Sequence, residues 1–314
     1  MKDKNARIGG ALTVILLFVL LWVTLYVPLA SAVSVWLIPL PLMYAVSKSG
    51  WRYGSMLLVL GIVFLLLIQR DLSMLFPIFF IILGFVMGET IRLKKSAFAV
   101  LLTGSLANIM MLILCLAGAV LIFDFNPVVE TKTAIERSLE SMVGQAGPLL
   151  HQNAGTLLSM YKSYLNYLGN IAPSLIVMIG VVYASIIEWI SLPILRRFRI
   201  KVPEWVPFRR WQVPKSVVWI YLIALLLIQT GLTTDGDPLF IMAINIAFVM
   251  QILLAIQGLS FIFYFASHRR LPVIVPAIVT VAVIIFSFLL LQLVTLLGII
   301  DLGFDLRKRL DKKK

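Results

Sequence analysis

Charged residues and the residue types of enzyme active sites are scarce in this chain. Of its 314 residues only 13% are Asp, Glu, Lys or Arg, and it contains two histidines and one cysteine, Cys115. A single cysteine excludes an internal disulfide, and His151 and His268 fall in separate loops. The sequence has no zinc-type His or Cys spacing and no Walker-type glycine loop. We therefore expect no enzymatic activity, no metal site, no cofactor and no ATPase within the chain.

Hydrophobic residues are abundant instead, at 61% of the chain. A helix needs about 20 apolar residues to cross the hydrocarbon core of a bilayer, and several runs approach or exceed that length. The composition predicts an all-α, polytopic transmembrane helix bundle of about nine helices. The expected crossings are residues 11–29, 33–47, 53–69, 74–88, 97–123, 171–195, 217–232, 239–265 and 273–300. More spans follow the first, so we interpret it as a retained transmembrane helix and not a signal peptide.

The distribution of Lys and Arg predicts the orientation. With the N-terminus in the cytoplasm of a bacterial cell, 17 of the 27 basic residues fall in inside loops and only Arg70, Lys132, Arg137 and Lys162 in outside loops. Nine crossings place the basic tail "DLRKRLDKKK" outside, against this rule. Eight crossings, with the tail inside, are the alternative, because 273–300 is long for one span. The partner expected for these charges is anionic lipid headgroups at the surface of the bilayer.

A basic linker predicts the division of the chain. We expect a six-helix membrane unit at 1–195, a cytoplasmic linker at 196–216 and a three-helix unit with the basic tail at 217–314. The linker alternates basic residues with Trp205, Phe208 and Trp211, a pattern that between spans indicates an interfacial belt and not a nucleic-acid site. The outer loop at 124–170 carries an amphipathic helix, which either rests on the membrane surface or covers a cavity.

Isolated polar residues within the spans are the candidate ligand contacts. Glu188, in "YASIIEWISLP", is the deepest acid and has Trp189 beside it. Asn108 lies in the middle of "LLTGSLANIMMLIL", and Asn245 lies in the eighth expected span. Such residues are costly in hydrocarbon and face protein or a cavity. Each is explained either by a hydrogen bond between helices or by a ligand.

Small residues predict close helix contacts, within the bundle or with a partner protein. The pairs at suitable spacing are Gly84 and Gly88, Gly54 and Gly61, and Ala6 and Gly10. Two prolines, Pro39 and Pro41, predict a broken helix in the second span, because each removes a backbone donor. Such a break is tolerated only where it is covered by protein or lines a cavity, so this one is either packed against other helices or bounds a binding site.

Several of these segments resemble the YybS family of uncharacterised bacterial membrane proteins. They are "WLIPLPLMYAVSKSGWRYGSMLLVLG", the glycine-bearing fourth helix with basic residues after it, and "LGIIDLGFDLRKRL". More distantly, residues 1–195 are similar to the S components of energy-coupling-factor transporters, with six helices and a Pro-x-Pro pattern followed by spaced glycines. That resemblance implies a small-molecule or lipid-binding protein related to transport, which would need a coupling module as partner. The rod-shape protein MreD has a similar architecture, so the alternative is a membrane scaffold or regulator that acts through protein partners.

Overall fold

Every described element is helical, as the sequence predicts. The structure is a computed structural model that describes residues 2–69, 75–150, 154–230 and 236–311. Six described helices are long and apolar enough to cross a membrane: Pro28–Ser49, Trp51–Ile68, Leu75–Arg92, Ala97–Phe123, Ala172–Arg197 and Pro238–His268. Four shorter apolar helices accompany them: Gly10–Tyr26, Ser216–Gln229, Ile274–Ile285 and Leu289–Phe304. All ten coincide with segments expected to lie in the membrane.

The chain divides into two compact units, and each is described by itself. Unit 1 comprises Met1–Phe125 and Ile176–Trp205, and unit 2 comprises Asn126–Leu175 and Val206–Lys314. This division differs from the sequence boundaries 1–195, 196–216 and 217–314, because the outer segment belongs to the C-terminal unit. Within that unit Asn245 holds the backbone of the segment by hydrogen bonds to Asn170 and Ser174.

Unit 1 is a helix bundle around an apolar core. Its helices are α1 (Lys2–Tyr26), α2 (Pro28–Leu37), α3 (Pro39–Ser49), α4 (Trp51–Ile68), α5 (Leu75–Arg92), α6 (Ala97–Phe123) and most of α9 (Ala172–Arg197). Leu17, Leu42 and Met87 are fully buried in this core. The Ser96 side chain caps α6 by accepting the Ala99 N–H at 3.2 Å, so the short turn after α5 leads directly into the next helix.

The broken helix packs tightly on α5. A Cβ atom added at Gly84 would lie 2.4 Å from the Pro39 carbonyl oxygen, and one at Gly88 would lie 2.8 Å from Met43 Cα. Pro39 and Pro41 are both buried in α3. The break is therefore covered by protein at α5, one of the two settings in which a broken helix is tolerated. The two glycines let the backbones of α3 and α5 touch.

The remaining small residues also make contacts inside unit 1. A Cβ at Gly54 would lie 2.2 Å from Val46 Cγ2, and one at Gly61 would lie 3.1 Å from Leu17. The Tyr53 hydroxyl donates to the Gly10 carbonyl oxygen at 2.9 Å and joins α4 to α1. The side chain of Ala6 lies outside the described residues. The described glycines of these pairs therefore serve the bundle itself.

Unit 2 contains an outer pair of helices and a C-terminal bundle. Its elements are α7 (Pro127–Leu150), α8 (Ala154–Asn170), the start of α9, a 3-10 turn (Phe208–Arg210), α10 (Ser216–Gln229), α11 (Pro238–His268), α12 (Ile274–Ile285), α13 (Ser287–Phe304) and α14 (Leu306–Asp311). Helices α7 and α8 pair through Glu140 and Lys162, whose charged atoms are 2.8 Å apart. That contact raises the pKa of Lys162.

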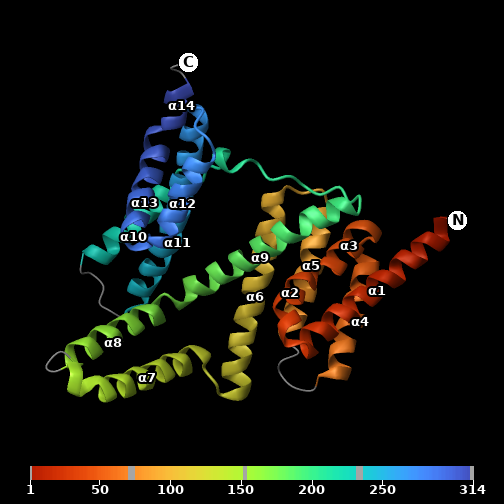
Figure 1. Cartoon of the computed structure of the whole chain (residues 1–314), viewed down its shortest axis with the longest axis horizontal. Helices are drawn as coiled ribbons and strands as arrows, with labels where there is room; N and C mark the ends of the chain where they lie inside the picture. Colours follow the sequence, from red (N-terminus) through yellow and green to blue (C-terminus); the bar gives the residue numbers. More distant parts are fainter. Residues whose placement is uncertain (1, 70–74, 151–153, 231–235, 312–314) are drawn as a thin grey trace. The chain divides into compact units, whose positions relative to one another are not determined.

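The last apolar segment is a helical hairpin. Helix α12 has 12 residues, about 18 Å of helix at 1.5 Å per residue, too short for a hydrocarbon core of about 30 Å. The chain turns at Phe286, and α13 runs back beside α11 (Figure 1). Gly258 and Gly298 allow this close approach, since a Cβ at either would lie 2.1 Å from a carbonyl oxygen of the other helix.

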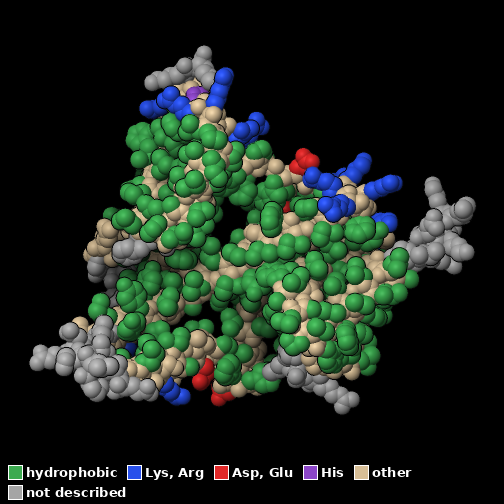
Figure 2. Space-filling model, viewed as in Figure 1, with side chains coloured by type: hydrophobic (Ala, Val, Ile, Leu, Met, Phe, Trp, Pro, Cys, Tyr) green, Lys and Arg blue, Asp and Glu red, His purple; other side chains and the backbone are tan. Residues whose placement is uncertain are grey.

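This hairpin decides where the basic tail lies within unit 2. Helix α14 contacts the end of α11 and the 3-10 turn of the linker. Tail and linker therefore share one end of the unit, where Figure 2 shows Lys and Arg gathered, while hydrophobic side chains cover the flank. Of the two crossing counts, this geometry supports eight. In that arrangement α12 and α13 form one hairpin that begins and ends at the same end of the unit, in place of a ninth crossing.

Candidate ligand-binding site

Glu188 is buried near the end of α9. Its residue surface is only 1% exposed, and neither carboxylate oxygen has a hydrogen-bond partner among the described residues. The indole of Trp205 is the polar neighbour that acts on this carboxyl, although the pair falls outside hydrogen-bond geometry. An ionised carboxylate held away from water without a counter-charge costs several kcal/mol. The group is therefore stable as a neutral acid or when paired with a cation that enters the site.

A fold-back after α9 builds one wall of this site. Arg199 has a positive φ of 62°, and the Ile200 N–H returns to the Leu195 carbonyl at 3.1 Å, which ends the helix in a turn. The chain then runs back along α9, and Ile200, Val202 and Trp205 pack against the core of unit 1. Trp205 is brought in this way from the linker to the level of Glu188.

The resulting Glu188 cavity has a volume of about 330 Å³. Its lining is Glu188, Trp189, Leu192, Pro193 and Arg196 from α9, and Pro203, Glu204 and Trp205 from the fold-back. Because Pro193 has no N–H, the Trp189 carbonyl lacks its usual i+4 donor within the helix. Arg196 and Glu204 form an ion pair of 3.3 Å with both side chains exposed, which contributes little stability but flanks the opening with both charges.

The chemistry of this lining favours a small organic cation. A carboxylate can neutralise an ammonium group, and indole faces attract cations by about 0.5 to 2 kcal/mol. Pockets for small molecules typically combine apolar walls with a few polar groups that orient the ligand, as here. Within the described part of the chain no cluster of three His, Cys, Asp or Glu residues could hold a metal ion.

Asn108 does not line this cavity. Its side-chain amide donates to the Gly180 carbonyl oxygen on α9 at 3.3 Å, and the residue is buried. Gly180 precedes Glu188 by eight residues, about 12 Å along a helix. The same interface brings Gly104 against Ala184. Asn108 is thus a helix-packing residue in this structure, one of the two interpretations that its sequence position allows.

Asn245 belongs to unit 2 and is also explained by packing. Its side chain accepts the Ser174 N–H at 2.7 Å and donates to the carbonyls of Asn170 and Ile241, each at 2.7 Å. Three hydrogen bonds use most of what one amide offers. Of the four predicted ligand contacts, the structure brings only Glu188 and Trp189 together at a cavity.

A second buried acid, Asp301, lies in unit 2, and sequence reasoning did not single it out. Its Oδ2 accepts from Arg307 Nε at 2.9 Å and from Gln257 Nε2 at 2.6 Å. Arg307 also donates to the Arg209 carbonyl at 2.9 Å and to the Ser260 hydroxyl at 3.1 Å. All four side chains, of Gln257, Ser260, Asp301 and Arg307, are buried, and we call them the C-terminal clamp.

The clamp joins three distant segments. Ser260 Oγ lies 2.8 Å from the carbonyls of Phe208 and Trp211, and Gln257 Oε1 accepts the Val213 N–H at 2.9 Å. The clamp thus joins the linker to α11, α13 and α14. Asp301 and Arg307 stand six residues apart around a helix end, and that pairing of opposite charges was the available sequence signal. From the sequence, Arg307 is considered only as part of the basic tail.

These observations define a polytopic helical membrane protein with a buried acid in each unit. The chain belongs to the family described as "Predicted membrane protein (DUF2232)", which matches residues 14–302. It is 26% identical over 315 residues to "Uncharacterized protein YybS" of Bacillus subtilis (strain 168), which covers 98% of this chain and 99% of that protein. The expected membership of the YybS family is confirmed. No solved structure matches the chain, so the comparisons give no support to the likeness to S components.

Proposed function

We propose that this integral membrane protein binds a small organic cation in the Glu188 cavity and serves transport of that ligand. The observation that carries the proposal is a buried carboxyl without a hydrogen-bond partner among the described residues, in the wall of a cavity that Trp189 and Trp205 also line. A positively charged ligand supplies the counter-charge that the described residues do not. The chain catalyses no reaction in this proposal, and energy for transport comes from a separate membrane partner.

The position of the cavity fits delivery from or to the cytoplasm. We place the N-terminus in the cytoplasm of a bacterial cell, where the end of α9 carries Arg196 and Arg197 on the same side. The hairpin of α12 and α13 supports this orientation, because it returns the basic tail to the side of the basic linker. Only four of the 27 Lys and Arg residues then remain outside.

Packing of the glycines favours binding over the scaffold alternative. A scaffold that used the glycine faces would need them free, yet Gly54, Gly84 and Gly88 contact Val46, Pro39 and Met43 of the same unit. A partner helix could dock on these faces only after displacing α3. Trp189, at 80% exposure, is the large side chain at the cavity that remains open to a ligand.

The test uses choline as a small ammonium probe and its neutral carbon isostere as the matched ligand. Protein in lipid nanodiscs is titrated with each, and heat of binding and thermal stability are recorded. We expect choline to bind and to stabilise the protein, and the isostere to do neither, because only choline neutralises Glu188. Native mass spectrometry of the protein as purified identifies any cation that is retained from the cell.

Two substitutions that each remove one negative charge distinguish a specific role of Glu188 from a general effect of charge near the cavity. Glu188→Gln keeps the volume and removes the charge, so bound cations are lost. Glu204→Gln removes an exposed acid of the same cavity, already paired with Arg196, and keeps binding within about threefold, less than 1 kcal/mol. Equal binding of choline and its isostere, or retention of cations by Glu188→Gln, contradicts the proposal.

A further inference from the structure

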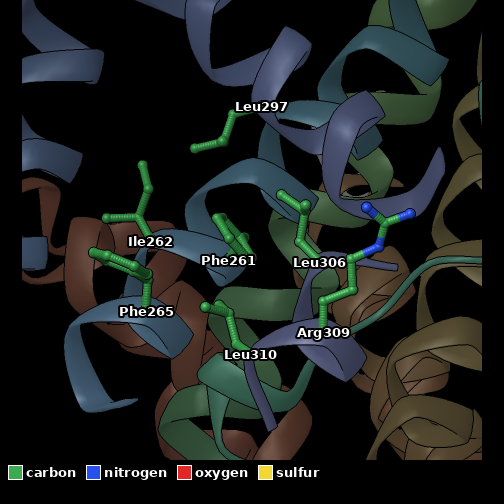
Figure 3. A pocket seen from close by; sticks show the side chains of 7 residues that line it. All are labelled: Phe261, Ile262, Phe265, Leu297, Leu306, Arg309 and Leu310. Carbon is green, nitrogen blue, oxygen red and sulfur yellow. The ribbon is translucent and has the colours of Figure 1, made fainter. Parts of the chain in front are cut away.

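A second cavity lies in unit 2, between the end of α11 and the C-terminal helix. It has a volume of about 400 Å³ and is open at one side. Figure 3 shows apolar side chains around it, from α11, from α13 and from α14, with Arg309 at its edge. We call it the α14 pocket, after the short helix that supplies Leu306, Arg309 and Leu310. None of its residues takes part in the Glu188 cavity.

One guanidinium group lines this pocket, and a second lies beside one of its lining rings. The Arg309 side chain lines it, and the Arg269 guanidinium lies 5.6 Å from the ring centre of Phe265, another lining residue. No described carboxylate forms an ion pair with either arginine. Asp305 is close enough for Arg309 to lower its pKa, but its hydrogen bond goes to Lys215 at 2.7 Å. Arg309 therefore adds a positive charge without an ion pair to an apolar lining, and Arg269 adds a second next to Phe265.

The pocket is preformed, because the clamp fixes the helix that walls it. Arg307 precedes Arg309 by two residues and is buried in its bonds to Asp301, Ser260 and the Arg209 carbonyl. The Tyr264 hydroxyl donates to Asp311 at the other end of α14. Leu306 and Leu310, four residues apart, consequently turn the same face toward α11.

We propose that the α14 pocket binds one anionic phospholipid, with an acyl chain beside Phe261 and Leu310 and the phosphate between Arg269 and Arg309. The charges decide the specificity. Since bilayer tails are as apolar as the pocket, burying a chain there gains little over leaving it among other lipids. Each basic residue near anionic headgroups adds a preference of about fivefold. This proposal does not depend on the function of the Glu188 cavity.

The experiment is native mass spectrometry of the protein released from nanodiscs that contain equal amounts of phosphatidylglycerol and phosphatidylcholine. We expect one phosphatidylglycerol molecule to be retained per chain, in excess over phosphatidylcholine by at least about tenfold, given two arginines. Arg269→Gln combined with Arg309→Gln removes this preference. Leu310→Trp fills the pocket and removes the retained lipid while both charges remain.

The matched control is Lys308→Gln, which removes a neighbouring exposed charge outside the pocket and keeps the preference within about twofold. Equal retention of the two lipids by the unmodified protein overturns the proposal, and so does an unchanged preference in the double arginine variant. Displacement of phosphatidylglycerol by inorganic phosphate also overturns it, because the site would then recognise free phosphate and not a lipid. If Leu310→Trp fails to fold, the arginine variants still decide the outcome.

Discussion

Each unit buries one carboxylic acid, and the two acids differ in their hydrogen-bond partners. Glu188 in unit 1 lines a cavity, and its oxygens have no hydrogen-bond partner among the described residues. Asp301 in unit 2 is bound by Arg307 and Gln257, and no cavity residue is among its partners. A paired acid fixes segments in place, whereas an unpaired acid is retained at a cost in stability. The difference separates a structural charge from one available to a ligand.

Breaking the clamp has the largest expected effect. Arg307→Met leaves Asp301 buried without its counter-charge, so the free energy of unfolding falls by about 3 to 5 kcal/mol. Titration with sodium dodecyl sulfate in mixed micelles measures the change. Lys308→Met, at the exposed neighbouring position, changes it by less than about 0.5 kcal/mol. A small effect of Arg307→Met would show that the two acids do not differ as we describe.

The second prediction concerns the backbone contact between α3 and α5 inside unit 1. Gly84→Ala places a methyl group against the Pro39 carbonyl and lowers the free energy of unfolding by about 1 to 3 kcal/mol. Gly118→Ala, in α6 with nothing within 4 Å of the new atom, raises it by up to about 1 kcal/mol. The same detergent titration compares the two. Equal effects would mean that α3 and α5 are not in backbone contact.

The third prediction exchanges the unpaired acid for an apolar residue. Glu188→Leu removes an unsatisfied buried group and raises the free energy of unfolding by about 1 to 3 kcal/mol in the absence of ligand. Asp301→Leu lowers it, because Arg307 then loses its carboxylate. We thus expect the free energy of unfolding to change in opposite directions in the two variants. A decrease in Glu188→Leu would instead show that Glu188 has a structural role.

The smallest effect concerns an exposed acid, Asp305, whose pKa is lowered chiefly by the hydrogen bond from Lys215. Because this pKa is lower in the folded state, the pair stabilises the protein at pH values above the ordinary pKa of an aspartic acid. That contribution is lost as the pH falls through the lowered value. Lys215→Met therefore reduces the melting temperature slightly at neutral pH and not at acidic pH. A difference from the unmodified protein that is constant with pH would contradict this linkage.

Hydrophobic runs predicted the helices well, because a bilayer leaves few alternatives to a helix of about 20 apolar residues. The expected span at 97–123 coincides with α6, Ala97–Phe123. The prediction for 273–300 was ambiguous for a physical reason. Its composition is equally compatible with one long helix and with a hairpin, and the turn at Phe286 carries no proline or glycine to mark it.

The candidate site was predictable in part. Glu188 was identified from its sequence, because an acid deep in an apolar span is rare and costly. Its neighbours were not, since Trp205 lies 17 positions later, in a linker interpreted as an interfacial belt. Asn108 and Asn245 were also predicted as ligand contacts, but in the structure they make hydrogen bonds to other helices. Their amides look the same in sequence as ligand contacts, and only their partners, Gly180 and Ser174, show that they join helices.

The sequence by itself determined the membrane class, the helical fold, the family and the presence of one acid worth examining. Each of these depends on composition or on residues close together in the chain. The tertiary structure decided which polar groups are satisfied, because a hydrogen-bond partner can come from any distance along the sequence. It paired Asp301 with Gln257, 44 residues away, and left Glu188 without such a partner. That difference in long-range contacts distinguishes the clamp from the cavity.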